Sequence, residues 1–405
     1  MRPDQLAALR TPEGVRALAA AAELAGGDPL AAAAALRGAG VPADLAAAAL
    51  TQAELRRRAA AKFGGDADRM FFTRAGLEQA TRSAVAERRA ARLRATGVRT
   101  LGDLGCGIGA DAIAAARAGI VVNALEADPA TAAIAAANAE ALGLDGITVK
   151  HGDATAADLS DVDAVFCDPA RRRDGRRVFD PAAYSPPWDF VAALPERVPR
   201  TVLKLAPGID HALIPPGAEA EWVSVRGEVV EAAFWCGPLA EVPRRATLLG
   251  AADVPSRATP LGGVELTGSG VAKAPVGPLA PYLYDPDGAV VRAHLVAEFA
   301  ATVAGHLADP EIAYVYAEAP APTPYARCLA IEEVLPFSLK RLRALLRERG
   351  VGRLEILKRG SALEPERLRR DLRLSGPAAA TLVLTRVAGA PTALICAPLS
   401  GAEST

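Results

Sequence analysis

The chain has 405 residues, a hydrophobic fraction of 51% and a formal net charge of −1 at pH 7. This length predicts about two or three domains with apolar cores. The near-neutral charge excludes a protein that is attracted to nucleic acid or membranes through its overall net charge. No uninterrupted run reaches the roughly 18 apolar residues that span a bilayer. The five cysteines are scattered and form no CxxC pair, which predicts neither a zinc site nor disulfides. We therefore expect a cytoplasmic protein without a bound metal.

Residues 1–95 are predicted to form an N-terminal helical region. Alanine runs alternate there with Leu and Arg, which favours helix. Glycine-rich breakers interrupt the pattern at residues 26–27, 38–40 and 64–65, and we expect helices to end near them.

Residues 96–250 contain short β-rich runs separated by helix-like segments, which is typical of a parallel sheet with crossover helices. The expected strands are 100–104, 121–126, 148–151, 164–167 and 201–205, followed by two closing strands at 221–225 and 232–236. Residues 251–330 are expected to be a connecting segment that is helical over 288–305. Residues 331–400 are predicted to form a small α/β domain with helices at 338–349 and 364–371 and strands at 354–358, 380–385 and 393–397.

The strongest functional signal is a glycine loop, Asp103-Leu104-Gly105-Cys106-Gly107-Ile108-Gly109, between a predicted strand and a predicted helix at 110–118. Glycines at these spacings let a backbone turn tightly and approach a ligand closely. The third glycine follows the second too closely for the GxGxxG pattern of a dinucleotide site. The preceding acid can accept a hydrogen bond from the methionine end of S-adenosylmethionine (SAM).

Acidic residues also follow the next strands of the predicted sheet. Glu126 ends the second strand, where a carboxylate can bind both ribose hydroxyls. Asp153 follows the third strand, where it can accept from the adenine amino group, and Asp168 follows the fourth. Because ligands of open α/β sheets bind at the carboxyl ends of the strands, we predict a SAM site formed by Asp103, Gly105, Gly107, Gly109, Glu126 and Asp153.

This order of residues resembles the class I SAM-dependent methyltransferases, which implies a doubly wound, seven-stranded Rossmann-like sheet. A narrower resemblance, from about residue 60 to 397, is to the methyltransferases that carry a C-terminal THUMP-like domain. It is carried by residues 71–81 (FFTRAGLEQAT), 168–172 (DPARR), 204–207 (KLAP) and 284–293 (YDPDGAVVRA). True THUMP domains bind structured RNA, chiefly tRNA, so the resemblance implies an RNA partner, either tRNA or rRNA.

The reactive end of the site is expected at Asp168-Pro169-Ala170-Arg171. This segment occupies the place of the Asn/Asp-Pro-Pro-aromatic motif with which amino-methylating enzymes hold an exocyclic amine, although Ala170 and Arg171 replace the second proline and the aromatic residue. Asp168 is therefore an expected catalytic acceptor or base. Lys204, which ends the fifth strand close to Asp168, is the other expected catalytic residue.

Basic residues are expected to bind the phosphates of an RNA substrate. Arg171, Arg172 and Arg173 begin an arginine-rich run beside the reactive strand. The C-terminal domain is expected to add a basic helix face and the residues that follow it, namely Lys340, Arg341, Arg343, Arg347, Lys358 and Arg359.

Together these features favour an enzyme that methylates a base nitrogen in tRNA or rRNA. A ribose 2′-O-methyltransferase is an alternative, because Lys204 with Glu228 or Glu231 resembles part of the Lys-Asp-Lys-Glu set of those enzymes, with Lys62 as the candidate first lysine. A small-molecule methyltransferase and a non-catalytic RNA-binding protein with a SAM-type fold are the others. Covalent C5 methylation of pyrimidines is disfavoured, because neither Cys106 nor Cys167 is well placed as a nucleophile.

Overall fold

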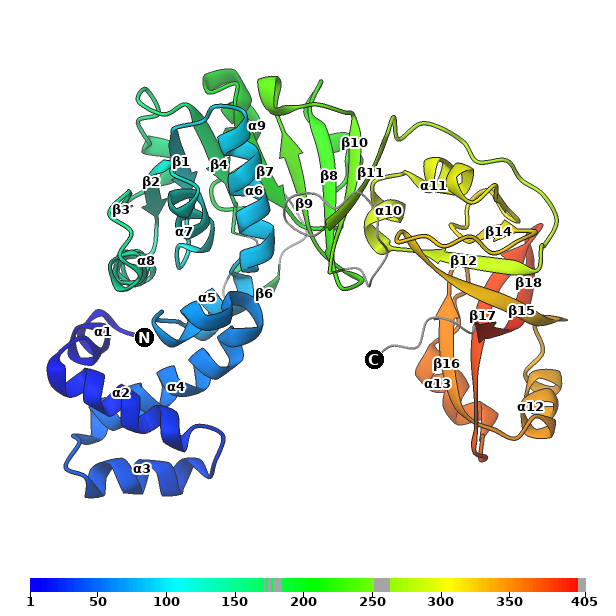
Figure 1. Cartoon of the computed structure of the whole chain (residues 1–405), viewed down its shortest axis with the longest axis horizontal. Coiled ribbons are helices and arrows are strands. Elements are labelled where there is room, and N and C mark those ends of the chain that lie inside the picture. The colour runs from blue at the N-terminus through cyan, green and yellow to red at the C-terminus, as the bar shows by residue number, and fades with distance from the viewer. Residues whose placement is uncertain (171, 174–175, 178–183, 251–262, 400–405) are drawn as a thin grey trace. The chain divides into compact units, whose positions relative to one another are not determined.

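The computed structural model describes residues 1–170, 172–173, 176–177, 184–250 and 263–399. They form two compact units (Figure 1). The first unit is Met1–Leu205 with Ile209–Ala218 and Ala233–Glu241, and the second is Ala206–Gly208, Glu219–Ala232 and Val242–Thr405.

The first unit begins with the helices that the alanine-rich pattern predicts. Pro12 and Pro29 occupy first turns, where a missing N–H is tolerated, and Thr11 and Asp28 cap the same helices with side-chain oxygens. The helices are α1 (Pro3–Leu9), α2 (Pro12–Leu24), α3 (Pro29–Gly38), α4 (Ala43–Phe63), the 3-10 helix η1 (Gly64–Asp68), α5 (Arg74–Gln79) and α6 (Ser83–Ala95). Helix ends therefore fall at the predicted glycine breakers.

These helices share one apolar core with the glycine loop that follows the first strand. Leu9, Ala49 and Phe72 are buried in the same cluster as Ile108 and Ile134. Burial of this apolar surface stabilises the helices against the loop, so the N-terminal helices help to position the site.

A nine-stranded sheet follows, with the strand order β11-β10-β8-β9-β7-β4-β1-β2-β3. Leu104 pairs with both Leu125 and Cys167 in parallel register, so the neighbouring strands end level with one another. The elements from β1 to β7 are β1 (Thr100–Leu104), α7 (Ala110–Arg117), β2 (Val121–Glu126), α8 (Pro129–Leu142), β3 (Ile147–His151), η2 (Ala154–Ala156), β4 (Ala164–Cys167), β5 (Arg172–Arg173), β6 (Arg176–Arg177), α9 (Trp188–Arg197) and β7 (Thr201–Leu205).

The predicted fold class is confirmed, but the sheet has nine strands where the resemblance implied seven. The order from β3 to β8 accounts for those seven. Arg226 and Gly227 alone join β8 to β9, a turn short enough to require an antiparallel hairpin. The remaining elements of this region are η4 (His211–Leu213), β8 (Glu219–Val225), β9 (Glu228–Trp235), η5 (Gly237–Leu239), β10 (Arg244–Leu249) and β11 (Gly263–Gly268). β10 and β11 extend the sheet, and β11 comes from the segment expected to be a connection.

The second unit contains a seven-stranded sheet with the order β13-β14-β12-β15-β18-β17-β16. Helices α12 and α13 pack on it through Leu342, Leu346 and Leu368. Its elements are β12 (Tyr282–Pro286), α10 (Gly288–Arg292), α11 (Val296–Thr302), β13 (His306–Leu307), β14 (Val315–Ala317), β15 (Ala326–Pro336), α12 (Leu339–Glu348), β16 (Val351–Lys358), α13 (Pro365–Leu372), β17 (Ala378–Val387) and β18 (Ala390–Pro398).

The prediction of a single helix over 288–305 was wrong in one respect, because the segment is split into α10 and α11. His294, between them, has a φ of 59°, which is outside the helical region. The long strand β15 was not predicted at all. It pairs with both β12 and β18, so the expected connecting segment and the expected C-terminal domain contribute to a single sheet.

Candidate cofactor and catalytic site

The glycine loop turns back from β1 into α7 through left-handed backbone conformations. Gly105, Gly107 and Gly109 have φ values of 84°, 55° and 91°, which favour glycine over residues with a side chain. A Cβ on Gly105 would lie 3.1 Å from the backbone oxygen of Asp168, whereas a Cβ on Gly107 would meet no atom within 4 Å. The loop is therefore packed against the end of β4 on one side and open at its centre.

Backbone hydrogen bonds fix this loop to the second strand. The N–H groups of Gly105 and Cys106 both donate to the carbonyl of Leu125, at 2.9 and 3.1 Å. The N–H of Gly107 donates to Glu126 Oε2 at 2.9 Å, and the N–H of Asp128 donates to Glu126 Oε1 at 3.0 Å. The acid that was expected to bind the ribose is thus held directly beside the glycine loop.

Asp153 lies at the end of β3 and is exposed. Its Oδ1 accepts a hydrogen bond from the N–H of Thr155 at 2.8 Å, so the carboxylate caps η2. That backbone bond to the charged form lowers the pKa of Asp153 below its ordinary value. An ionised acceptor therefore stands at the third strand end.

Asp103 is fully buried, and neither carboxylate oxygen has a hydrogen-bond partner among the residues that the structure describes. Burial raises the pKa of Asp103 well above its usual range, and the like charges of Asp111 and Asp168 add to this shift, while Arg89 and Lys204 oppose it. A buried acceptor without a partner is costly unless a ligand satisfies it. Such an acid beside an open glycine cradle fits the charged methionine end of SAM.

Asp168 and Lys204 are brought together, as the strand order predicts. Cys167 pairs with Leu203, so the next residues on β4 and β7 are neighbours. The Lys204 ammonium group donates to Asp168 Oδ2 in an ion pair. Its side chain is 8% exposed and that of Asp168 is 27% exposed, so the carboxylate is the member of the pair that a substrate can reach.

Three side chains behind the loop were missed by the sequence analysis. Thr81 Oγ1 donates to Asp111 Oδ2 at 2.6 Å, and Arg89 forms an ion pair with Asp111 Oδ1. The guanidinium of Arg89 also lies 4.6 Å from the ring centroid of Phe166 on β4. The group joins α6 to the first turn of α7. The sequence contained a signal that Arg89 is buried, since it lies on the apolar face of α6 with Ala86 and Ala90. Arginine in a helix normally indicates a solvated face, however.

The N-terminal segment of the resemblance packs on the same loop. Asn138 on α8 accepts from the N–H of Phe71 at 2.7 Å and donates to the carbonyls of Phe71 and Ile108 at 3.2 and 2.9 Å. A Cβ on Gly76 would lie 2.6 Å from Ile108 Cγ2, so glycine permits this close approach. Lys62 donates to three backbone carbonyls at the end of α5, which does not support it as the first lysine of a ribose 2′-O-methyltransferase.

The expected phosphate ligands lie partly outside the described residues. Arg171 is not described, and for Arg172 and Arg173 the structure describes only the backbone, in which β5 pairs antiparallel with β6. Cys106 and Cys167 are buried, and burial raises the pKa of both thiols. Neither is therefore an activated nucleophile.

Three of the expected basic residues of the C-terminal domain have structural contacts. Lys358, which is exposed, donates to the carbonyl of Leu363 at 2.9 Å and to Glu364 Oε1 at 3.2 Å. Arg343 and Arg359 are half-buried and are held by contacts as well. Arg343 donates to the carbonyl of Asp371, and Arg359 Nη2 donates to Asp285 Oδ1 at 2.8 Å and to the carbonyl of Pro286 at 3.0 Å. The expectation that both would bind phosphate is corrected accordingly. The exposed basic residues of α12 are Lys340, Arg341 and Arg347.

In the described part of the chain, no helix is long and apolar enough to cross a membrane. Nor do the described residues bring together three or more His, Cys, Asp or Glu side chains in a group that could hold a metal ion.

The sheet order, the glycine loop and the acids at the strand ends define a class I SAM-dependent methyltransferase. Known proteins agree with this class. The chain is 35% identical over 360 residues to an uncharacterized S-adenosylmethionine-dependent methyltransferase of Mycobacterium tuberculosis, covering 85% of this chain and 95% of that relative. The chain belongs to the SAM-dependent methyltransferases, and is thus an enzyme with SAM as its cofactor.

Two family matches describe parts of the chain, and one solved structure resembles nearly all of it. A family described as "THUMP domain-like" matches residues 326–398, and a domain of unknown function, DUF8688, matches residues 2–59. A solved structure from Porphyromonas gingivalis, described as a "putative methyltransferase", shares the fold with a TM-score of 0.72 and 21% identity, over 99% of this chain and 100% of that one. The THUMP-like family named from the sequence is confirmed.

Proposed function

We propose that this enzyme methylates a base nitrogen in tRNA or rRNA. The observation that carries the proposal is the carboxylate of Asp168, paired with Lys204, at a strand end whose backbone oxygen lies against Gly105 of the cofactor loop. This position is next to the proposed cofactor site and is partly exposed, as a substrate-holding group must be.

The cofactor residues in this proposal are the six named from the sequence. Asp103 and the backbone around Gly105, Gly107 and Gly109 would hold the methionine end, because the buried carboxylate lacks a partner there. Glu126 would bind the ribose hydroxyls, and Asp153 would accept from the adenine amino group. When bound, SAM supplies an electrophilic methyl group.

The side chains of this chain then act on the substrate amine. Asp168 accepts a hydrogen bond from the amino group through Oδ1, because Lys204 binds Oδ2. Lys204 keeps the carboxylate in one orientation, and the bonded nitrogen presents its lone pair to the methyl group. The proton that the nitrogen loses can pass to the same carboxylate.

The RNA substrate is supported by basic residues directly after Asp168 and by others in the C-terminal domain. The run from Arg171 to Arg173 directly follows the Asp168 segment, and these residues are proposed to bind phosphates. The THUMP-like match and the exposed Lys340, Arg341 and Arg347 support a further RNA contact. We expect the protein in the cytoplasm, as predicted from its cysteines.

Mass spectrometry of nucleosides from purified tRNA and rRNA tests the proposal. A deletion strain should lack one base-methylated nucleoside that the parent strain contains, and the purified enzyme with SAM should restore it on RNA from the deletion strain. Loss of a ribose-methylated nucleoside would identify the 2′-O alternative. An unchanged nucleoside profile in both RNA pools would favour a small-molecule substrate.

A further inference from the structure

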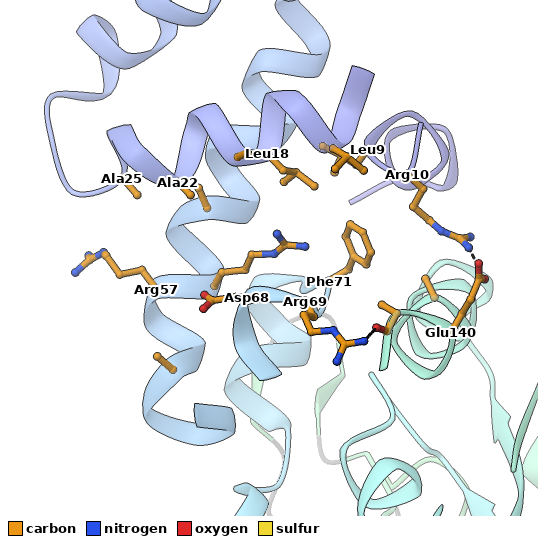
Figure 2. Close-up of a pocket in the computed structure, with 17 residues that line it drawn as sticks. Leu9, Arg10, Leu18, Ala22, Ala25, Arg57, Asp68, Arg69, Phe71 and Glu140 are labelled. Carbon is orange, nitrogen blue, oxygen red and sulfur yellow. Dashed lines mark hydrogen bonds and ion pairs between the residues drawn. The ribbon is translucent and has the colours of Figure 1, made fainter. Parts of the chain in front are cut away.

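The N-terminal helices contain a cavity of about 960 Å³ whose lining includes none of the proposed cofactor and catalytic residues. Figure 2 shows Leu18 and Ala22 of α2 on one wall and Arg57, Asp68 and Phe71 on the facing wall. Most of this region matches a domain to which no function is assigned. The volume is in the range of pockets that hold small ligands. We call this cavity the N-terminal groove.

Arg56 on α4 gives the groove a donor that lacks an acceptor. Its Nε donates to the carbonyl of Met70 at 2.9 Å, and its guanidinium lies 5.2 Å from the ring centroid of Phe71. Its two terminal nitrogens donate no hydrogen bond to any residue that the structure describes. The side chain is half-buried, and this burial lowers the pKa of Arg56, although the charge of Asp68 opposes the shift.

The other arginines along the groove already have partners. Arg10 pairs with Glu140, and Arg69 donates to the carbonyl of Ala141. Arg57 pairs with Glu54 at 3.0 Å. Arginine side chains outnumber acidic ones among the lining residues, since Arg10, Arg56, Arg57 and Arg69 face Asp68 and Glu140. The groove therefore complements an anion, and Arg56 has the donors to receive it.

We propose that the N-terminal groove binds a nucleotide of the RNA substrate, with a phosphate on Arg56 and the base beside Phe71 and the alanine wall of α2. The proposal rests on the RNA substrate given under Proposed function. A guanidinium fork suits phosphate oxygens, and aromatic and guanidinium planes stack on bases of any sequence. An alanine wall leaves room for a flat group without competing for hydrogen bonds.

The groove is physically joined to the cofactor loop. Phe71, which lines it, is hydrogen-bonded to Asn138, and the same Asn138 side chain donates to the carbonyl of Ile108 at 2.9 Å. A nucleotide held there would thus bind to the same rigid part of the molecule that holds the cofactor loop, as an anchor for an RNA whose target base reaches Asp168.

Two alanines on α2 allow a matched test. Ala22 lines the groove and Ala20 does not, and both are exposed on the same helix. In the full-length protein, Ala22→Glu should weaken binding of bulk tRNA or rRNA fragments by about fivefold or more through repulsion of the phosphate. Ala22→Lys should strengthen binding, and Ala20→Glu should change it by less than about twofold. SAM affinity should remain unchanged in all three variants, which shows that they are folded.

RNA containing 4-thiouridine gives a direct readout by photo-crosslinking and peptide mass spectrometry. Crosslinks to peptides spanning residues 9–25 or 53–71, lost in Ala22→Glu, would support the groove. If wild-type protein binds RNA but Ala22→Glu and Ala20→Glu bind it equally, the groove proposal is wrong and the proposed function stands. If the wild type binds neither RNA pool, the RNA substrate itself is wrong. If free AMP binds in a way that Ala22→Glu abolishes while RNA affinity is unaffected, the occupant is a free nucleotide and the proposal is overturned.

Discussion

The ammonium group of Lys204 and the carboxylate of Asp168 form an ion pair at the carboxyl ends of the paired strands β7 and β4. The Lys204 side chain is nearly buried, whereas the Asp168 carboxylate is partly exposed. An enclosed charge is stabilised chiefly by its partner, so each residue holds the other in place. The pair therefore behaves as one unit that presents a single oriented carboxylate oxygen.

Asp168→Asn should reduce methylation of RNA by at least about a hundredfold while SAM affinity changes little, because we propose that the carboxylate acts on the substrate amine. Lys204→Met should also reduce kcat, since it leaves the acid without its fixed partner. Asp158→Asn is the control, because Asp158 is an exposed loop acid that bonds to the neighbouring Ser160. A parallel loss of SAM affinity and activity in Asp168→Asn would make Asp168 a cofactor ligand.

Glu126→Ala should weaken SAM binding by roughly 1.5–3 kcal/mol, because it removes the carboxylate that we propose binds the ribose hydroxyls. It also removes the acceptor for the N–H of Gly107. Gly107→Arg should abolish binding by filling the open centre of the loop. Calorimetry measures both, with Asp145→Ala as a control for loss of an exposed acid before β3. Tight NAD binding without SAM binding would contradict this assignment.

Asp103 should make the stability of the SAM-free enzyme depend on pH. A carboxyl group whose pKa is raised by folding binds more protons in the folded than in the unfolded protein. The free energy of unfolding should therefore fall as pH rises from about 3.8, the ordinary value, to the raised pKa, by up to about 1.4 kcal/mol per pH unit.

Asp103→Asn removes this titration, so the variant should gain stability relative to the wild type as pH rises through that window, yet bind SAM more weakly. Urea unfolding at several pH values measures the difference. Asp163→Asn is a control with the opposite sign, because hydrogen bonds from the N–H groups of Arg99 and Thr100 lower the pKa of Asp163. A constant difference between wild type and Asp103→Asn across pH would show that Asp103 is not protonated by burial.

The sequence was informative where local pattern and strand alternation act together. β1, β2, β4 and β7 begin and end at the predicted residues, because each is a short apolar run with a clear break at both ends. The proposed site residues at the ends of these strands come from the same pattern. The proximity of Asp168 and Lys204 was predicted from their neighbouring strands, whereas their ion pair was not predicted.

Tertiary contacts explain what the sequence could not show. Arg89 is buried because Asp111 and the ring of Phe166 receive it, and no local pattern shows such a partner. Local sequence predicts Arg359 as a phosphate ligand, but it pairs with Asp285 from a strand that is distant in the sequence. The division of the chain into four segments at residues 95, 250 and 330 stays a prediction.

Arg359→Ala should destabilise the protein rather than its RNA complex. Its guanidinium donates to Asp285 through Nε at 3.0 Å and Nη2 at 2.8 Å, and it lies 5.4 Å from the ring centroid of Tyr314. Loss of these charge-assisted bonds should cost about 2–4 kcal/mol, measured as a fall in Tm. Arg353→Ala, an exposed change on β16, the strand that ends just before Arg359, is the control and should leave Tm within about 1 °C. Equal Tm values for the two variants would show that the contact contributes no stability.

Charge reversal on α12 should weaken RNA binding in proportion to the phosphates that are contacted. Arg341 and Arg347 are exposed, whereas Arg343 is held by the Asp371 carbonyl. Arg341→Glu with Arg347→Glu should therefore lower RNA affinity and flatten the slope of log affinity against log salt by about one unit per lost contact. Point changes are preferable to removing residues 331–405, because β15 and β18 share their sheet with β12.

The control for this last experiment is Arg16→Glu, an exposed reversal on α2 that lies outside the groove lining. Each variant changes the net charge by two per site, so a general loss of electrostatic attraction would act on the control as well. If the α12 variant alone loses affinity and slope while it still binds SAM, the THUMP-like domain contacts RNA. Unchanged RNA affinity in the α12 variant would contradict that role and leave RNA recognition to the arginine run after Asp168 and to the N-terminal groove.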